Sequence, residues 1–338
     1  MRAAASTGNL RAKIFLIVAN LVAIACLIWA LSHANLKELW PEIRALEWQW
    51  VLIAVIADIC VYIAQAWRWN ILLTPVARAP LWRTVRAIYV GLFANEVLPM
   101  RTGEVIRCYL MSRWSQLPFS VVLSSGFIER IFDGVWLIVL FFVTLQFVQL
   151  PGLVHNLAWA LMVIVGLLGG LLLLTILSKS TVHRLVSDTG RWKHKLLVLI
   201  DDVHAMGSSP TFFYSFWASP LYIMLQAVPI FAILRAYGFV EGSFAMGAVL
   251  MVVLRLGTVV PNAPGNLGTF QVLAATGLAM FVKDQAMAYR FSFILWGVVT
   301  LPLLLAGFVA LFVTGFRLSE LQKQAQEIAD APEQARAL

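Results

Sequence analysis

Ionisable side chains stand inside apolar segments of this chain, where a charge is costly. Asp58 lies in the middle of one such segment, Glu129, Arg130 and Asp133 lie near the start of another, and Arg255 lies in a third. At the centre of a bilayer a charged side chain costs at least about 2.5–3.5 kcal/mol, so charged residues there are candidates for functional sites. Ion pairing, anion binding and proton transfer are the roles open to these groups.

Four arginines could bind an anion together: Arg101, Arg107, Arg130 and Arg255. A planar guanidinium holds a phosphate in bidentate fashion, and a helix N-terminus also favours anions. The sequence therefore predicts an anionic headgroup on an apolar tail as the ligand. The candidate substrate-binding residues are Arg101, Glu104, Arg107, Glu129, Arg130, Asp133 and Arg255.

Each of these assignments has a structural alternative. Asp58 serves either in transport, as a proton or ion-pair group, or as a buried partner of Arg130 or Arg255. The acidic cluster around Arg130 could instead be solvated at the cytoplasmic boundary, because long side chains extend toward water. Glu104 and Arg107 could equally lie on an amphipathic helix in the membrane interface.

Motifs of catalysis and cofactor binding are missing from the sequence. It contains no Gly-x-Ser-x-Gly, His-Glu-x-x-His, phosphate-binding loop or dinucleotide-binding glycine motif. Its cysteines stand far apart and its histidines fall in polar connections, which argues against a metal site. We therefore expect no enzyme activity, no cofactor and no metal. The basic residues are spread over short loops, so nucleic acid is not an expected partner.

Composition assigns the chain to the membrane. Of its 338 residues 61% are hydrophobic and 12% are charged, whereas a soluble domain has roughly 45–50% apolar and about 25% charged residues. Six segments have the length of a spanning helix and predict an all-α polytopic membrane protein: Ile14–Leu31, Trp50–Leu72, Val121–Val148, Leu157–Leu177, Phe212–Tyr237 and Tyr289–Phe316. The side chains expected in the aromatic belt at the membrane surface are Trp67, Trp69, Trp82 and Trp114.

Two further apolar stretches are interrupted by proline and glycine. One breaks at Pro99 and Gly103, and the other breaks at Pro261 and Gly265. Proline removes a backbone donor and glycine ends helices, so both stretches predict broken or re-entrant helical hairpins. Irregular backbone at membrane depth is tolerated where it lines a cavity. The residues assigned to the two loops are Asn95, Pro99, Gly103, Pro261, Pro264 and Gly265.

The two loops stand at corresponding places in the two halves of the chain. Units of about 50–148 and 212–316 each contain a crossing helix, a broken stretch and a second crossing helix, and they enter the membrane from opposite sides. This order predicts an inverted-topology repeat whose discontinuous helices build the substrate site near the midplane. The single transmembrane domain covers residues 1–317, and 318–338 form a short cytoplasmic tail. This tail begins with a short amphipathic stub, Arg317–Lys323, and then frays.

The distribution of basic residues predicts the orientation. With the N-terminus in the cytoplasm, most of the 25 Lys and Arg residues, Arg68 among them, fall on the cytoplasmic side. Both termini are therefore expected in the cytoplasm. The apolar run that begins at Ile14 is longer than the core of a signal peptide, about 7–15 residues, so we expect an uncleaved first helix.

An ordered set of motifs resembles a known family. The set is Arg68-Trp69-x-x-Leu72-Leu73, then Gly91-x-Phe93-x-Asn95-x-x-Leu98-Pro99-x-Arg101-x-Gly103-Glu104-x-x-Arg107, then Glu129-Arg130-x-x-Asp133, and finally Pro261-x-x-Pro264-Gly265-x-x-Gly268. It is similar to the lysylphosphatidylglycerol synthase transmembrane-region family, the flippase-like integral membrane proteins with YbhN-like members, over about residues 10–317. The resemblance implies movement of a lipid between leaflets of the bacterial inner (plasma) membrane. It does not imply lysyl transfer, which belongs to a separate soluble domain in that family.

These observations together predict a flippase for a phosphate-bearing lipid or a polyprenyl-linked molecule. The chain departs from many relatives at Gln271, where they have an acidic residue, so no proton role is carried over to that position. Without an ATP-binding motif, transport would draw on an ion or lipid gradient. Two alternatives stay open: a membrane enzyme that acts on a lipid-linked substrate through Glu129 and Asp133, and a non-catalytic partner that delivers lipid to a separate lipid-modifying enzyme. The oligomeric state and the identity of the lipid are not predicted.

Overall fold

The computed structural model describes residues 18, 20–98, 102–144, 146, 152–177, 200–239, 243–257 and 264–330. Every regular element within these residues is helical and no strand occurs among them, which confirms the all-α prediction. Five long helices form the body: α3 (Trp48–Leu73), α6 (Phe119–Thr144), α7 (Gly152–Leu177), α10 (Pro210–Ala236) and α13 (Gln285–Thr314). Each of them covers a segment that the sequence predicts to cross the membrane.

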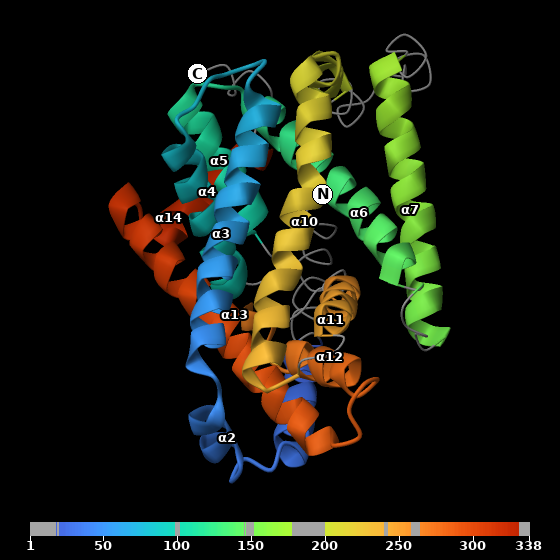
Figure 1. Ribbon diagram of the computed structural model, residues 1–338. Helices are drawn as coiled ribbons and strands as arrows, with labels where there is room; N and C mark the ends of the chain where they lie inside the picture. The colour runs from blue at the N-terminus through green and yellow to red at the C-terminus, as the bar shows by residue number, and fades with distance from the viewer. Residues whose placement is uncertain are drawn as a thin grey trace, which may run out of the picture.

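The long helices pack around one pair. α3 and α10 run side by side along the length of the molecule, and α7 lies at its edge, against α6 (Figure 1). A further helix, Asn20–His33, covers the described part of the first predicted segment. The short helix α2 (Leu39–Ala45) connects this helix to α3 at one end of the molecule.

Local sequence defines the ends of two long helices. Ser209 precedes α10, and its hydroxyl accepts a hydrogen bond from Thr211 N. Asp284 precedes α13, and its carboxylate accepts one from Met287 N at 3.1 Å. These side chains satisfy backbone donors that have no partner inside the helix. Gly315, with φ 71°, ends α13 in the left-handed conformation that favours glycine.

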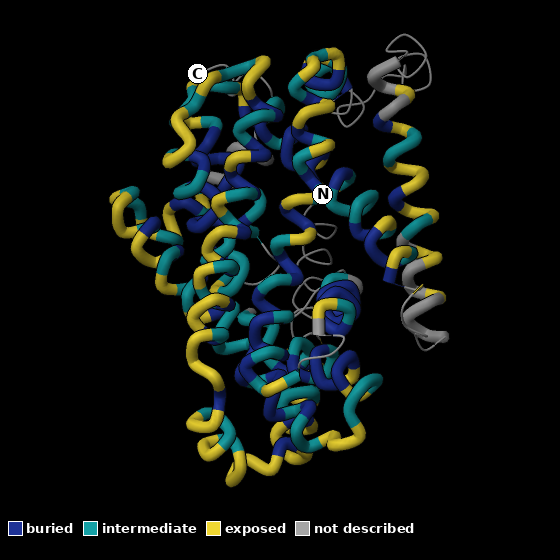
Figure 2. Tube along the Cα trace, viewed as in Figure 1, coloured by how far each residue is buried: buried dark blue, intermediate teal, exposed yellow. Residues whose placement is uncertain are grey.

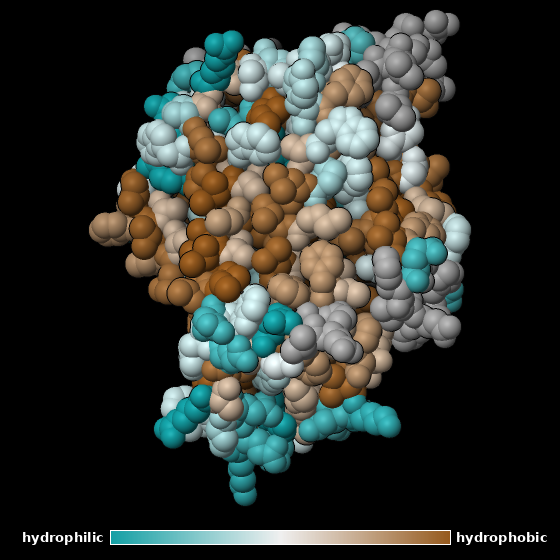
Figure 3. Space-filling model, in the orientation of Figure 1, coloured by the Kyte–Doolittle hydropathy of each residue, from teal (hydrophilic) through white to brown (hydrophobic). Residues whose placement is uncertain are grey.

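The outer surface is that of a membrane protein. By length and apolar composition α3, α10 and α13 qualify as membrane spans, whereas α6 has the length but carries Glu129, Arg130 and Asp133. Large apolar side chains are exposed on the outer faces, among them Leu52, Ile56, Leu305 and Phe312. Figure 3 shows a hydrophobic band around the middle of the molecule and hydrophilic side chains gathered at both ends.

Both interrupted stretches consist of two helices packed on one another, which confirms that they are broken. α4 (Leu81–Val97) packs against α5 (Gly103–Ser115). α11 (Ser243–Gly257) packs against α12 (Thr269–Leu278), and the short 3-10 helix η2 (Pro264–Asn266) lies between them in the sequence. We call these pairs the first and the second hairpin.

The first hairpin depends on glycine at position 103. A Cβ on Gly103 would overlap the carbonyl oxygen of Gly91 and would lie 2.6 Å from Asn95 Oδ1. In its absence Asn95 Oδ1 accepts a hydrogen bond from Gly103 N at 2.8 Å. This bond pairs one of the free N–H groups at the start of α5 with the last turns of α4. Asn95 and Gly103 therefore hold the two arms together.

The second hairpin packs closely against helix Asn20–His33. Gly268 has φ 87°, and a Cβ there would overlap the carbonyl oxygen of Ala23. The other end of the same helix is bound to α13, because Trp29 Nε1 donates to Tyr289 Oη at 2.9 Å. The first helix thus packs directly on the second half of the chain.

Burial concentrates on the inner faces of the helices, and those of α3 and α10 are buried over most of their length (Figure 2). The helix in the tail extends further than the short amphipathic stub, Arg317–Lys323, that the sequence predicts. Residues Leu318–Asp330 form helix α14, because Leu321 is buried and Tyr109 Oη on α5 donates to Gln324 Oε1 at 2.6 Å. Residues 331–338 lie outside the described part of the chain.

Candidate functional site

A buried ion-pair network joins α3, α5 and α6. Glu129 is wholly buried, and its two carboxylate oxygens accept hydrogen bonds from Arg68 Nη2 at 3.1 Å and from Arg107 Nη1 at 2.9 Å. Arg68 Nη1 also lies 2.5 Å from Asp133 Oδ1 and 3.0 Å from Ser219 Oγ on α10. Three helices, α3, α6 and α10, therefore meet at Arg68, and each buried charge of the network has an opposite charge beside it, as burial requires.

The network extends toward solvent through Arg130 and Glu104. Arg130 lies 3.7 Å from Glu104 and 3.4 Å from Asp133, and Glu104 accepts a hydrogen bond from Arg107 Nε at 2.8 Å. Arg130 thus lies beside two of the acidic candidate residues, Glu104 and Asp133. The side chains of Glu104 and Arg130 are 41% and 42% exposed, so this part of the network is accessible whereas Glu129 is not.

Two expectations from the sequence are wrong at this network. Arg68 does not face the cytoplasm, because its side chain is fully buried and stacks over the ring of Tyr222 at 4.6 Å. Trp69 does not belong to an aromatic belt: it is fully buried, donates to Ser125 Oγ at 2.9 Å and carries the Arg107 guanidinium over its ring at 4.6 Å. Both side chains turn inward because α6 supplies their polar partners.

A cavity of about 250 Å³ lies between the two hairpins. Its walls come from α3, α4, α5, α6, α10, α11, η2, α12 and α13, so it sits where the two halves of the chain meet. The polar and charged side chains that line it are Asp58, Tyr62, Gln65, Asn95, Glu96, Glu104, Arg130, Tyr222, Gln226, Arg255, Asn266 and Thr300. It is the place where the buried polar residues of both halves converge.

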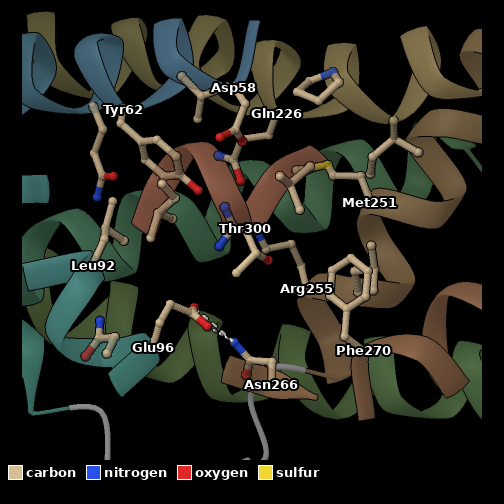
Figure 4. Close-up of a pocket in the computed structure, with 18 of the residues that line it drawn as sticks. Asp58, Tyr62, Leu92, Glu96, Gln226, Met251, Arg255, Asn266, Phe270 and Thr300 are labelled. Carbon is tan, nitrogen blue, oxygen red and sulfur yellow. Dashed lines mark hydrogen bonds between the residues drawn. The ribbon is translucent and has the colours of Figure 1, made fainter. Parts of the chain in front are cut away.

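Opposite walls of the cavity differ in chemistry (Figure 4). Asp58 and Gln226 lie together on one wall, supplied by α3 and α10. Asn266 Nδ2 donates to Glu96 Oε1 at 3.2 Å on the opposite wall, and this bond links the two hairpins. Arg255 reaches into the space between the walls.

The structure separates the predicted site residues into two groups. Glu104, Arg130 and Arg255, with Asp58, line the cavity. The other group stands behind the wall and contains Arg107, Glu129 and Asp133. Arg101, Pro99 and Pro261 lie outside the described residues.

Arg107 is buried, is bound to Glu104 and Glu129, and does not line the cavity, so a phosphate in the cavity would not reach it. Arg130 and Arg255 are the predicted phosphate ligands that reach the cavity.

The remaining predicted loop residues have structural roles. Gly265 has φ 73°, and its carbonyl oxygen accepts a hydrogen bond from Trp296 Nε1 at 3.0 Å, which ties η2 (beginning at Pro264) to α13. Gln271, the position at which relatives have an acidic residue, is fully buried, and its Oε1 accepts from Gly268 N at 2.6 Å. Gln271 thus caps α12.

Sequence reasoning missed several residues of the site: Arg68, Glu96, Gln226 and Asn266. One signal was present for Glu96, which adjoins the loop residue Asn95 and ends an apolar stretch as an ionisable group. Arg68 belongs to the motif Arg68-Trp69-x-x-Leu72-Leu73, but its place near the end of an apolar segment pointed to the membrane boundary. Gln226 and Asn266 gave no signal, because amides are ordinary at such positions.

The charges that line the cavity nearly balance: Asp58, Glu96 and Glu104 against Arg130 and Arg255. Such a site can accept a headgroup that carries both a phosphate and a group that donates hydrogen bonds. In the part of the chain that is described, no three His, Cys, Asp or Glu side chains are placed to hold a metal ion.

Comparison with known families gives one finding on the chain as a whole. The sequence model of the family described as "Lysylphosphatidylglycerol synthase TM region" matches residues 16–307. The matched range contains both hairpins and every residue that lines the cavity. A comparison with curated proteins gave no match.

Proposed function

Because the chain belongs to the lysylphosphatidylglycerol synthase transmembrane-region family, we propose that it moves a phosphate-bearing lipid, or a lipid-linked molecule, between the leaflets of a membrane. It is a multi-pass membrane protein of a family concerned with lipids. The observation that carries the proposal is the polar cavity between the two hairpins, with Arg130 and Arg255 in its lining, in a molecule whose outer surface carries an apolar band (Figure 3). A cavity of this kind has no use in a purely structural membrane bundle, since buried charges there are costly.

We propose further that the two halves form an inverted repeat. Several contacts within and between the halves have counterparts: α3 packs on α4 as α10 packs on α11, and α5 packs on α6 as α12 packs on α13. Likewise α4 packs on α13 as α11 packs on α6. A pseudo-twofold axis in the membrane plane produces this pattern and places the substrate site between the repeats. Six helices would then cross the bilayer: the one predicted over Ile14–Leu31, whose described part is Asn20–His33, and α3, α6, α7, α10 and α13.

In the proposed mechanism the headgroup enters the cavity while its tails stay in the bilayer. Arg130 and Arg255 bind the phosphate, since a guanidinium offers two parallel donors. Glu104 orients Arg107 and Arg130, and Glu129 orients Arg68 and Arg107. The tails lie along apolar surface, such as the groove between α3 and α13 that is lined entirely by apolar residues, Val51 and Leu301 among them. An ion or lipid gradient supplies the energy.

Localisation and orientation belong to the same proposal. We place the protein in a bacterial inner membrane with both termini in the cytoplasm. The accessible end of the network, at Glu104 and Arg130, then opens toward the cytoplasmic leaflet. α14, at the same end of the molecule as α5, lies at that surface.

No enzyme activity is proposed. The two carboxylates best placed for acid–base chemistry, Glu129 and Asp133, are held by Arg68, and Glu129 is wholly buried. A general acid or base must instead reach a substrate proton within hydrogen-bond distance. Enzyme activity is the second outcome that the experiment below separates from transport.

The test is reconstitution of the full chain into vesicles that contain phosphatidylglycerol labelled with a fluorophore on one acyl chain. Dithionite bleaches the outer leaflet, and bleaching of the inner pool reports movement across the bilayer. We expect movement well above that of protein-free vesicles, with the mass of the lipid unchanged. An unchanged inner pool would contradict transport, and a changed lipid mass would indicate an enzyme.

A further inference from the structure

Two hydrogen-bond acceptors on one wall of the cavity receive no donor from the protein. Asp58 on α3 is 5% exposed, Gln226 on α10 is 8% exposed, and both line the cavity. Among the residues that the structure describes, none donates a hydrogen bond to Asp58 Oδ2 or to Gln226 Oε1. Buried polar atoms are nearly always paired, and an unpaired acceptor beside a cavity calls for a donor from a bound molecule.

The orientation of the Gln226 amide is fixed by the backbone of α10. Its Nε2 points toward the carbonyl oxygen of Tyr222 at 3.5 Å. Turning the amide over would place Oε1 against that carbonyl, and two acceptors would then face one another. The oxygen therefore stays on the cavity side, next to Asp58 (Figure 4).

The rest of the cavity has donors of its own. The acceptors of Glu96 on the opposite wall are bound by Asn266 Nδ2 at 3.2 and 3.4 Å. Arg255 and Arg130 present guanidinium groups, which donate and carry positive charge. The cavity thus has a cationic part and, on the wall of α3 and α10, a part that accepts hydrogen bonds.

We propose that this wall is a second subsite, which selects lipids whose headgroup carries a hydrogen-bond donor, a hydroxyl or an ammonium, beyond the phosphate. The inference rests on the proposed lipid transport and deepens it. The phosphate binds at Arg130 and Arg255, and the donor binds at Asp58 and Gln226. A phosphodiester without such a donor leaves both acceptors unpaired, so it binds less tightly.

The test uses two pairs of lipids with equal charge within each pair. Phosphatidylglycerol has headgroup hydroxyls and phosphatidylmethanol has none, while phosphatidylethanolamine has an N–H donor and phosphatidylcholine has none. Dioctanoyl forms are titrated into the detergent-solubilised full chain, and native mass spectrometry measures the bound fraction. We expect the donor-bearing lipid of at least one pair to bind about tenfold more tightly, which corresponds to about 1.4 kcal/mol. The pair that discriminates identifies the donor as hydroxyl or ammonium.

Variants test whether Asp58 and Gln226 cause the preference for the donor-bearing lipid. Gln226→Leu removes an acceptor without changing charge, and Asp58→Leu removes both carboxylate oxygens, so each should bring the ratio within the discriminating pair close to one. Gln49→Leu is the matched control, because Gln49 is an exposed amide at the start of α3 whose partner is Glu47. If Gln226→Leu does not fold, Gln226→Met keeps the length of the side chain.

Three results overturn the inference: equal binding within both pairs, an unchanged ratio in the variants, or no binding of any of the four lipids. Its failure is distinct from failure of the transport proposal. If all four lipids bind equally and Arg255→Gln weakens them all, the phosphate site stands and the second subsite is wrong. If Arg255→Gln changes nothing, the transport proposal itself loses its phosphate site.

Discussion

Asn266 Nδ2 lies 3.2 Å from Glu96 Oε1, so the 3-10 turn of the second hairpin is hydrogen-bonded to the last turn of α4 in the first hairpin. Both residues line the cavity. A bond between the interrupted regions of the two halves is a contact that any rearrangement of one half against the other must change. It is therefore a point at which opening of the cavity can be measured.

Asn266→Asp should loosen this contact. Asn266 has φ 51°, a conformation that aspartate also tolerates, so the backbone is not strained by the change. The new carboxylate would face Glu96 without a donor, and the lost bond to a charged group is worth about 1.5–3 kcal/mol. We expect amide hydrogen exchange in residues 92–98 and 264–268 to rise about tenfold or more. Gln49→Glu, at an exposed amide–carboxylate contact, is the control, and equal exchange in both variants would show that the contact does not restrain the hairpins.

Arg68→Met should destabilise the protein severely. Arg68 is bound to Glu129 and Asp133 in a buried setting, and removing one partner of a buried pair costs about 3–5 kcal/mol. Lys323→Met removes half of the exposed pair with Glu327 and should cost about 0–1 kcal/mol. Thermal unfolding in detergent measures both. A melting temperature for Arg68→Met equal to that of Lys323→Met would mean that the network does not hold α3 to α6.

Gly103→Ala should separate the arms of the first hairpin. Its Cβ meets the Gly91 carbonyl oxygen, which is backbone and cannot move aside as a side chain could. Overpacking of this kind costs about 1–3 kcal/mol. Gly166→Ala, on α7, has open space around its Cβ and should stabilise by about 0.5–1 kcal/mol. Thermal unfolding of the two variants should therefore shift in opposite directions, and a shift in the same direction would argue against the close packing.

The proposed orientation is open to cysteine labelling. Arg78→Cys lies between α3 and α4 and should react with a membrane-impermeant maleimide only when the reagent is on the cytoplasmic side. Lys37→Cys lies between helix Asn20–His33 and α2 and should react only when the reagent is on the opposite side. The three native cysteines, Cys26, Cys60 and Cys108, must first be replaced, because Cys60 is exposed and would itself react. Labelling of both positions from the same side would show that α3 does not cross the bilayer.

Much of the fold could be predicted from local sequence. Apolar length located the long helices, and proline with glycine located the breaks in both hairpins. The partners of Arg130 could be expected too, because Asp133 follows it by one helical turn and Glu104 starts the preceding helix. These features depend on spacing along the chain.

The interior of the site depends on contacts that no local pattern records. Arg68 stands near the end of an apolar segment, where an arginine usually marks the membrane boundary. Its burial follows from Asp133 and Ser219, which are 65 and 151 residues away in the sequence. Asn266 and Glu96 are 170 residues apart. An isolated sequence offers no means of pairing such groups, so the cavity that they enclose appears only when the helices are packed.

The measurement that bears most directly on lipid transport through the cavity is the bleaching assay with arginine variants. Arg130→Gln and Arg255→Gln each remove a guanidinium from the cavity lining, whereas Arg235→Gln, at a site where the guanidinium stacks over Trp50 at 5.0 Å, is the matched control. All three are compared at equal amounts of folded protein in the same vesicles. We predict that acyl-labelled phosphatidylglycerol crosses the bilayer at least about tenfold more slowly with Arg130→Gln and with Arg255→Gln than with the wild-type protein. With Arg235→Gln it should cross at the wild-type rate. Wild-type rates in all three variants would contradict the phosphate site and, with it, passage of the headgroup through this cavity.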